Sequence, residues 1–231
     1  MTLNSLTYFF ILVASLAFPL LLSFDKKVAF YKKWKFLFPA MVLPAVFYIS
    51  WDIWFTSIGV WSFNEKYISG FHLLNLPIEE VLFFFVVPYC CLFIYECIRN
   101  YFPGIKDSRA SGIIFLLLGI VLFFTGLFFY EKYYTCATCL FTGIFIGIVY
   151  FFKDYFRHFN KSAFLVSYAI ILLPFLIVNG FLTSIPVVVY NNAENLGIRI
   201  STIPIEDSIY GMLLVLMNVV GYERLKKENK I

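Results

Sequence analysis

The chain has little charge. Charged residues make up 14% of its 231 residues, whereas hydrophobic residues make up 61%. A soluble domain of this length needs more polar surface than that to cover its core. No stretch is polar enough to form a separate soluble domain, and the small net charge of +4 gives no basis for nucleic-acid binding. The composition therefore favours a membrane protein over a soluble one.

Several functional signatures are also missing. No G-x-G-x-x-G fingerprint follows a strand-like segment, so no dinucleotide and no other organic cofactor is predicted. Cys136 and Cys139 have redox or metal spacing, but they lack a second cysteine pair and a nearby histidine, which favours a packing role and no metal. The first six residues contain no Lys or Arg, and no cleavage site precedes Asp25. We therefore expect a retained first helix rather than a signal peptide.

The sequence contains long apolar runs. Seven of them are long enough to cross a hydrocarbon core of ~30 Å as helices. The predicted spans are 4–24, 36–55, 77–98, 111–130, 133–152, 162–183 and 204–222. The sequence thus predicts an all-α polytopic membrane protein with seven transmembrane helices.

The loops between these runs differ in basic charge. Lys and Arg collect in 25–35, 99–110, 153–161 and the C-terminal tail, and the alternate loops have few. The positive-inside rule then predicts an N-terminus outside and a C-terminus in the cytoplasm. We expect the bacterial plasma (inner) membrane as the location.

The sequence also contains an internal repeat with an offset of 127 residues. Thr56-Ser57-Ile58 recurs as Thr183-Ser184-Ile185, and Pro77-Ile78-Glu79-Glu80 recurs as Pro204-Ile205-Glu206-Asp207. The repeat predicts a first three-helix unit (1–110), a linking transmembrane helix (111–130) and a second three-helix unit (131–231). Both units face the same way, so we expect a pseudo-two-fold axis along the membrane normal and a site between the halves.

The repeated motif opens two helices with acids at the membrane edge. Acids in a first turn stabilise the positive end of a helix dipole, which would explain one copy on its own. Two copies at the edge of a membrane favour a functional site, because acids there are costly. The catalytic candidates are therefore Glu79, Glu80, Glu206 and Asp207. Adjacent residues lie about 100° apart on a helix, so the two acids of a pair cannot face the same way.

Polar and aromatic residues near these acids are candidates for binding a substrate. Asp52 lies at the same outer level and corresponds to Asn179 in the second half, although a solvated helix end would also explain Asp52. Aromatic faces could line an apolar pocket and stabilise a cation. The predicted substrate-binding residues are Asp52, Trp54, Phe83, Phe84, Asn179 and Tyr210, with Trp51 and Trp61 nearby.

At these residues the sequence resembles the integral-membrane lycopene cyclase family. The resemblance rests on the Pro-x-Glu-(Glu/Asp) motif at a helix start, the three-helix unit and its duplication, and it covers nearly the whole chain. The chain looks like the fused form, with both half-units in one polypeptide. It departs from exact duplication at Asp207 for the second Glu and at Gly211 where Phe84 stands, which suggests two unequal halves.

The resemblance implies a redox-neutral reaction on a lipophilic carotenoid such as lycopene. A proton is added to the acyclic ψ-end, the carbocation closes a ring, and a neighbouring carbon loses a proton, which gives a β-ring. Such chemistry needs a protonated carboxyl and a carboxylate, and the four acids supply candidates for both. The resemblance also implies the bilayer as surroundings and association with other carotenoid enzymes.

Two other functions compete with this reading. A proton-coupled transporter also suits repeated intramembrane acids, but it needs a polar path across the bilayer. The predicted acids lie at one level only and the cytoplasmic halves of the spans are read as apolar, which argues against it. A retinal-type photoreceptor needs a lysine inside the last helix, and residues 204–222 contain none.

Overall fold

The structure, a computed structural model, describes residues 3–228 and is dominated by seven long helices. These are α1 (Thr7–Leu22), α2 (Trp34–Ser57), α3 (Ile78–Tyr101), α4 (Arg109–Phe128), α5 (Tyr133–Phe151), α6 (Lys161–Ser184) and α7 (Ile205–Glu228). Short 3-10 helices, Leu3–Leu6 and Phe30–Lys33, lead into α1 and α2. All seven are long and apolar enough to cross a membrane, which confirms the predicted fold class.

The helix ends follow local sequence signals. The α3 and α7 helices begin directly after Pro77 and Pro204, whose fixed φ angle suits a helix start. Side chains of Ser108 and Asn160 cap α4 and α6 by accepting hydrogen bonds from backbone N–H groups. The predicted spans agree with the helices to within three residues, except that α7 continues six residues beyond 222.

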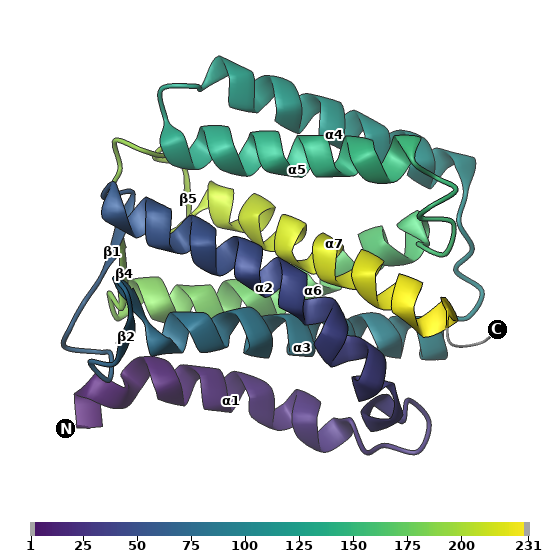
Figure 1. The fold of residues 1–231 in the computed structure, drawn as a ribbon, viewed down its shortest axis with the longest axis horizontal. Coiled ribbons are helices and arrows are strands. Elements are labelled where there is room, and N and C mark those ends of the chain that lie inside the picture. The colour runs from purple at the N-terminus through teal and green to yellow at the C-terminus, as the bar shows by residue number, and fades with distance from the viewer. Residues whose placement is uncertain (1–2, 229–231) are drawn as a thin grey trace.

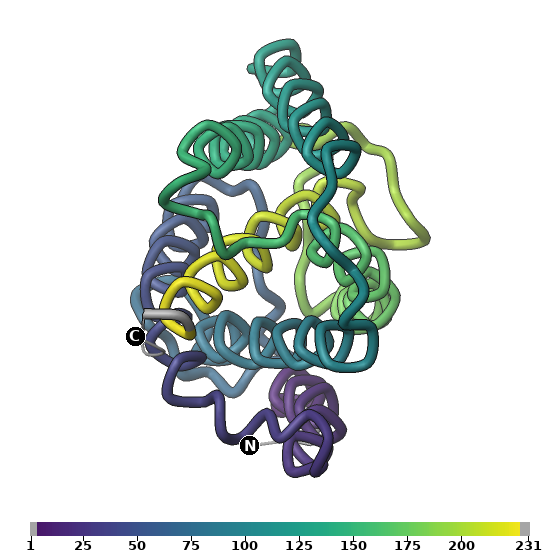
Figure 2. The backbone as a smooth tube through the Cα atoms, turned by 90° about the vertical axis from the view of Figure 1, so that its right-hand side faces the viewer, coloured from purple at the N-terminus to yellow at the C-terminus, as the bar shows by residue number. Residues whose placement is uncertain are grey.

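The helices surround a central one. Figure 2 shows α7 in the middle of the bundle, with α2, α3, α5 and α6 around it and with α1 and α4 on the outside. The burial pattern agrees, because the apolar window of α7 is 72% buried whereas that of α1 is 11% buried. The second unit therefore contributes the core helix of the whole molecule.

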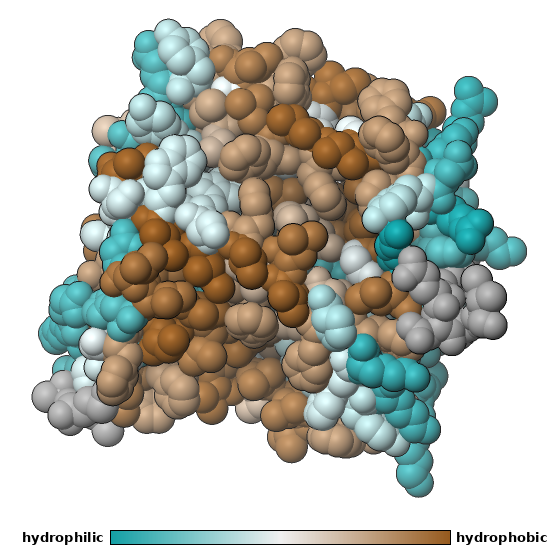
Figure 3. Space-filling view, in the orientation of Figure 1, coloured by the Kyte–Doolittle hydropathy of each residue, from teal (hydrophilic) through white to brown (hydrophobic). Residues whose placement is uncertain are grey.

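An apolar belt covers the flank of the bundle. Figure 3 shows hydrophobic side chains across the middle of one face and hydrophilic ones at its two ends. The exposed apolar side chains of the helices include Phe18, Leu43, Phe128 and Leu173. A belt of this kind suits a bilayer, where lipid rather than water covers the apolar surface. We call the end where α3 and α7 begin the site end, and the opposite end the basic end (Figure 1).

Three two-stranded sheets, which the sequence did not predict, close the site end. The β2 (His72–Leu73) and β3 (Leu76–Pro77) strands form a hairpin before α3, and β5 (Arg199–Ile200) and β6 (Ile203–Pro204) form its equivalent before α7. The third sheet joins the two units, because β1 (Trp61–Phe63) pairs antiparallel with β4 (Val188–Tyr190).

Hydrogen bonds beside this third sheet reveal the symmetry. The N–H of Asn64 donates to the carbonyl of Val187, and the N–H of Asn191 donates to the carbonyl of Val60, both at 2.9 Å. Asn191 and Val187 are the equivalents of Asn64 and Val60 at the 127-residue offset. A reciprocal pair of this kind is what a two-fold axis produces, and it supports the predicted parallel arrangement of the units.

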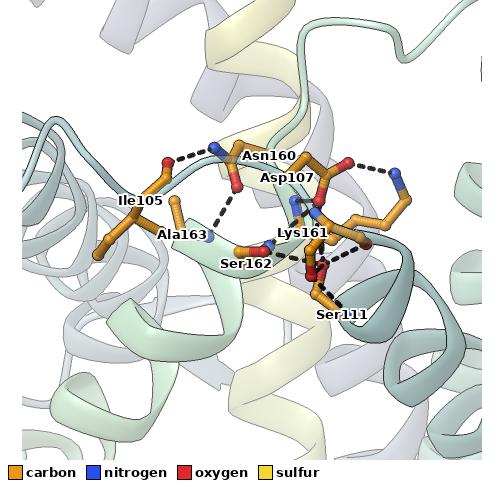
Figure 4. A network of polar contacts seen from close by, with 8 residues as sticks. Ile105, Asp107, Ser111, Asn160, Lys161, Ser162 and Ala163 are labelled. Carbon is orange, nitrogen blue, oxygen red and sulfur yellow. Dashed lines mark hydrogen bonds and ion pairs between the residues drawn. The ribbon is translucent and has the colours of Figure 1, made fainter.

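The loop before the linking helix is held to the second unit by hydrogen bonds at the basic end (Figure 4). Asp107, just before α4, accepts hydrogen bonds from the backbone N–H of Lys161 at 3.1 Å and from its ammonium at 2.9 Å. Partial burial raises the pKa of Asp107, but the hydrogen bond and charge of Lys161 outweigh it and hold that pKa below its ordinary value. Asn160 extends the network by donating to the carbonyl of Ile105.

The basic end also contains buried acids, so the expectation that intramembrane acids lie at one level is wrong. Glu96 in α3 is fully buried and pairs with Lys33 and Lys226, and it accepts a hydrogen bond from Tyr222 at 2.7 Å. Glu223 is also buried and accepts from Tyr95. The sequence analysis treated the cytoplasmic ends of the spans as apolar although Glu96 lies within 77–98, and it ended the last span at 222, one residue before Glu223. Two lysines neutralise Glu96, which makes this cluster a helix-to-helix brace.

Candidate functional site

Three carboxylic acids line one small cavity at the site end. Asp52 comes from the end of α2, Glu80 from the start of α3 and Asp207 from the start of α7, and each is at most 8% exposed. The cavity has a volume of about 40 Å³, which suffices for a few water molecules. Its other lining residues are Tyr8, Trp61, Phe63, Phe83, Tyr134, Phe175, Asn179, Leu182, Val188, Tyr190 and Tyr210. The site thus lies between the two units, as the repeat predicts.

Tyrosine hydroxyls hold the motif acids. Tyr8 donates to Oε2 of Glu80 at 2.6 Å. Tyr134 donates to Oδ1 of Asp207 at 2.6 Å, and Tyr190 donates to Oδ2 at 2.9 Å. Both oxygens of Asp207 therefore have a tyrosine partner, whereas Glu80 has a tyrosine partner on one oxygen.

The third acid belongs to one half only. Tyr210 donates to Oδ1 of Asp52 at 2.5 Å across the interface between α7 and α2. At the 127-residue offset Asp52 corresponds to Asn179 and Tyr210 corresponds to Phe83, and both of these also line the cavity. The pseudo-two-fold scaffold therefore surrounds a cavity whose two sides differ in chemistry.

The other acid of each motif points away from the cavity and fixes a loop. Glu79 accepts a hydrogen bond from the N–H of Ser69 at 2.7 Å. Glu206 accepts from the N–H of Leu196 at 2.8 Å and from the Thr135 hydroxyl at 2.6 Å. Both acids are fully buried, but neither lines the cavity. The 100° between adjacent helix residues separates these acids from Glu80 and Asp207.

Aromatic rings enclose the cavity at the Asp52 side. The ring of Tyr210 lies 4.7 Å from that of Tyr48, 5.2 Å from that of Trp51 and 6.2 Å from that of Trp61, measured between centroids. Such a wall is apolar, yet its ring faces attract a cation.

Two of the predicted binding residues lie outside this wall. Trp54 is 47% exposed, its ring lies tilted against that of Phe55 with the centroids 4.9 Å apart, and it does not line the cavity. Phe84 is fully buried and packs against Tyr48 and Phe83 without lining the cavity. Trp54 follows Asp52 by two residues, which turns it about 200° away around the helix. Phe83, three residues after Glu80, lines the cavity in place of Phe84, as Tyr210 does three residues after Asp207.

The sequence analysis missed the three tyrosines that hold the motif acids, although it predicted Tyr210, which holds Asp52. Tyr8 and Tyr134 each stand near the start of a unit, inside runs that read as apolar. Their offset is 126 rather than 127, so a strict search at one offset overlooks them. Tyr190 lies in strand β4, where burial and the nearby Asp207 carboxyl raise the pKa of its hydroxyl well above the ordinary value. Tyr190 therefore stays a hydrogen-bond donor.

No group of three His, Cys, Asp or Glu side chains within residues 3–228 is arranged to hold a metal ion. Cys136 and Cys139 are free thiols, the second of them buried. The polar chemistry of this cavity is that of carboxyls and phenols.

Seven helices long and apolar enough to cross a membrane, with three buried carboxyls in an aromatic cavity between them, define the class of protein: a polytopic membrane protein with an acidic internal site. Comparison with family models adds the specific assignment. The lycopene cyclase model matches residues 5–98 and 131–225, which are the two repeated segments and most of the chain. The chain therefore belongs to the lycopene cyclase family, which supports a role as a carotenoid cyclase. Neither the curated proteins nor the solved structures compared with it give a match.

Proposed function

We propose that this protein is a lycopene β-cyclase, an isomerase that converts the ψ-ends of lycopene to β-rings without a cofactor. One observation carries the proposal beyond family membership: three carboxyls from both units converge on a single aromatic cavity inside a membrane bundle. Acids at membrane depth are costly and are kept for function. Cyclisation of an acyclic polyene end needs the groups that this cavity has, namely a proton donor, a proton acceptor and walls that tolerate a cation.

The hydrogen bonds to each acid indicate which acid donates a proton and which one accepts it. A carboxyl oxygen that bears a proton is a weaker hydrogen-bond acceptor than a carboxylate oxygen, so a protonated carboxyl is favoured where one of its oxygens has no donor beside it. Both oxygens of Asp207 accept from tyrosines, and this arrangement suits a carboxylate. Glu80 and Asp52 each have one oxygen bound by a tyrosine. We assign Asp207 as the base, and we propose that Glu80 and Asp52 together hold the donated proton, so that both are needed for the reaction.

The proposed reaction conserves atoms and electrons. The donor carboxyl transfers its proton to the terminal double bond of the ψ-end and becomes a carboxylate. The resulting carbocation is attacked by an internal double bond of the same chain, which forms the ring bond. The base then removes a proton from the ring, and the electron pair of that C–H bond becomes the ring double bond. One proton is gained and one is lost, so no oxidant or reductant is required.

The aromatic walls have a defined task in this scheme. A carbocation inside a protein is captured by water or by a nearby nucleophile unless the surroundings exclude both. Trp61 and Tyr210 line the cavity, and an aromatic ring whose face meets a cation lowers the energy of that cation by about 0.5–2 kcal/mol without bonding to it.

We also propose the finer aspects of organisation predicted from the sequence. The basic loops favour an N-terminus outside and a C-terminus in the cytoplasm of a bacterial plasma membrane, which puts the site near the outer surface. The division into 1–110, 111–130 and 131–231 follows the repeat. A lipophilic carotenoid would reach the site from the bilayer, and other carotenoid enzymes would supply it.

The alternative of a proton-coupled transporter has less support. The α3 helix bears Glu80 near one end and Glu96 near the other, roughly 24 Å apart at the helical rise per residue. Tyr89 and Tyr95 are the polar-headed residues between them, and the rest of that stretch is apolar. The acids at the two ends are therefore separate clusters with no shared polar path along α3.

Pigment analysis tests the proposed function. The protein is expressed in a lycopene-accumulating bacterial strain, and the carotenoids are separated and identified by absorption and mass. We expect conversion of lycopene to monocyclic or bicyclic products of unchanged mass that contain β-rings. Unconverted lycopene in cells with folded protein in the membrane would contradict the proposal, as would products whose mass differs from that of lycopene.

A further inference from the structure

A second cavity, larger and almost wholly apolar, adjoins the acid site. It has a volume of about 290 Å³ and lies between α1, α3 and α6. Phe83, Phe175 and Asn179 line both cavities, so the two meet at these side chains. The other lining residues are Ala14, Ser15, Phe18, Pro19, Val87, Cys90, Cys91, Ile94, Ile171, Pro174 and Val178.

This cavity opens toward the lipid. Phe18 at its edge is 75% exposed, and Ala14 and Pro174 are also exposed. All three lie in the hydrophobic spans of α1 and α6, so what they meet is the bilayer core. The cavity thus lies between the hydrocarbon interior of the membrane and the side chains that it shares with the acid site.

The symmetry-related position in the other half is filled. Pro174 and Val178 of α6 correspond to Phe47 and Trp51 of α2 at the 127-residue offset. Ser15 of α1 corresponds to Phe141 of α5 at the offset of 126 that matches Tyr8 with Tyr134.

These three aromatic residues pack on one another. The Phe141 ring lies 5.7 Å from that of Phe47 and 4.9 Å from that of Trp51, measured between centroids. Small side chains therefore leave a channel on one side of the pseudo-two-fold axis. An aromatic plug (Phe47, Trp51 and Phe141) occupies the equivalent place on the other side.

We propose that the cavity between α1, α3 and α6 is the channel that holds the body of a linear polyene hydrocarbon while its end reaches the acid site. The inference rests on the proposed function and deepens it. The channel has an apolar lining, lipid at one mouth and carboxyls at the other, which suits a long hydrocarbon whose reacting end alone requires polar groups. Because the symmetry-related position is plugged, one polyene enters from one side and presents one end per binding event.

Filling the channel with the residue of the plugged half tests this inference. Val178→Trp places at position 178 the residue found at its equivalent, Trp51. The matched control is Ile177→Trp, because Ile177 is the next residue of α6, is 53% exposed and does not line the channel. Both variants add the same side chain to the same helix, so a difference in cyclisation between them measures the effect of filling the channel.

Two readouts keep the channel and the proposed function separate. The first is the pigment profile in a lycopene-accumulating strain, where Val178→Trp should lower cyclisation at least about tenfold and Ile177→Trp should leave it unchanged. The second is the lycopene that co-purifies with Glu80→Gln protein, which should bind the polyene without converting it. Adding Val178→Trp to that variant should remove most of the bound lycopene.

Three results would overturn the inference. One is unchanged cyclisation in Val178→Trp protein that is folded in the membrane. Another is bound lycopene that persists when Val178→Trp is added. The third is Glu80→Gln protein that retains phospholipid acyl chains and no lycopene. If the unaltered protein makes no cyclic product, the proposed function fails, and the co-purification readout still decides whether the channel holds a polyene.

Discussion

The two halves of the acid site share a backbone and differ in chemistry. In each half a tyrosine near the start of a unit holds the second acid of the motif, and the first acid fixes a loop by accepting a backbone N–H. Beyond this framework the halves diverge. Asp52 and Tyr210 form a hydrogen-bonded pair on one side, and their equivalents Asn179 and Phe83 cannot repeat it.

Under the proposed function, this divergence would make one directional site from a duplicated scaffold. A polyene end that gains a proton at one carbon and loses a proton at another needs unlike groups around it. Two identical halves would offer two identical groups. The exchange of Asp52 for Asn179, together with the aromatic plug on one side, removes that equivalence while the helices keep their places.

The largest effect should come from making the two sides alike. Asp52→Asn places on α2 the amide that α6 has at position 179, and it removes one of the two candidate proton donors. We expect cyclisation to fall by about 10²–10⁴-fold, the usual contribution of a positioned acid. Pigment yield per folded protein measures it. Glu65→Gln, which alters an exposed carboxylate at the same end, should have no effect. Equal yields from Asp52→Asn and Glu65→Gln would remove Asp52 from the mechanism.

A smaller loss should follow Tyr210→Phe, which places on α7 the residue that α3 has at position 83. The change deletes the hydrogen bond to Asp52 and keeps the ring in the aromatic wall. A hydrogen bond to a charged group is worth about 1.5–3 kcal/mol, so we expect cyclisation to drop about 10–100-fold. Tyr130→Phe, whose hydroxyl donates to exposed Glu131, is the matched control. A Tyr210→Phe protein as active as this control would show that the pair has no part in the reaction.

The sequence predicted the helices and the repeated motif, but it did not predict the contacts between them. Apolar runs predict spans because length and hydropathy are local properties, and Pro77 and Pro204 mark two helix starts. The hydrogen-bond partners of the acids depend on the tertiary structure. Tyr8 and Tyr134 look like two of many aromatics until folding brings them to Glu80 and Asp207. The pairing of β1 with β4 joins segments from different units, so no local sequence pattern predicts it.

Gly211 offers a comparison of packing rather than chemistry, with a still smaller effect expected. Its equivalent in the first half is Phe84, and a Cβ at position 211 would lie 2.5 Å from the Phe175 ring. Gly211→Ala should therefore destabilise the folded protein by about 1–3 kcal/mol and displace Phe175, which lines both cavities.

Gly221→Ala on the same helix is the control, because its Cβ would meet its nearest neighbour at an ordinary 3.6 Å. Thermal unfolding in detergent measures both variants. The packing account fails if Gly211→Ala is no less stable than Gly221→Ala.

The smallest effect should come from Asp107, which ties the linking segment to α6 of the second unit. Its lowered pKa stabilises the folded state above the ordinary carboxyl pKa of about 3.9, and this stabilisation is lost as the pH falls through the lower folded value. Because the side chain is 39% exposed, Asp107→Asn should cost well under about 1 kcal/mol at neutral pH. Unfolding followed at pH 7 and at acid pH should show that difference shrink with acid. A difference that grows with acid would reverse the assigned sign.

The central claim is that one acid of each motif serves the reaction and the other holds the structure. Four single amide variants, compared as cyclic pigment per folded protein, test it most directly. Glu80→Gln and Asp207→Asn should lose cyclisation by about 10²–10⁴-fold. Glu79→Gln and Glu206→Gln should accumulate less folded protein but keep most of the activity of each folded molecule. Full activity in Glu80→Gln and Asp207→Asn, or equal loss in all four variants, would contradict the account.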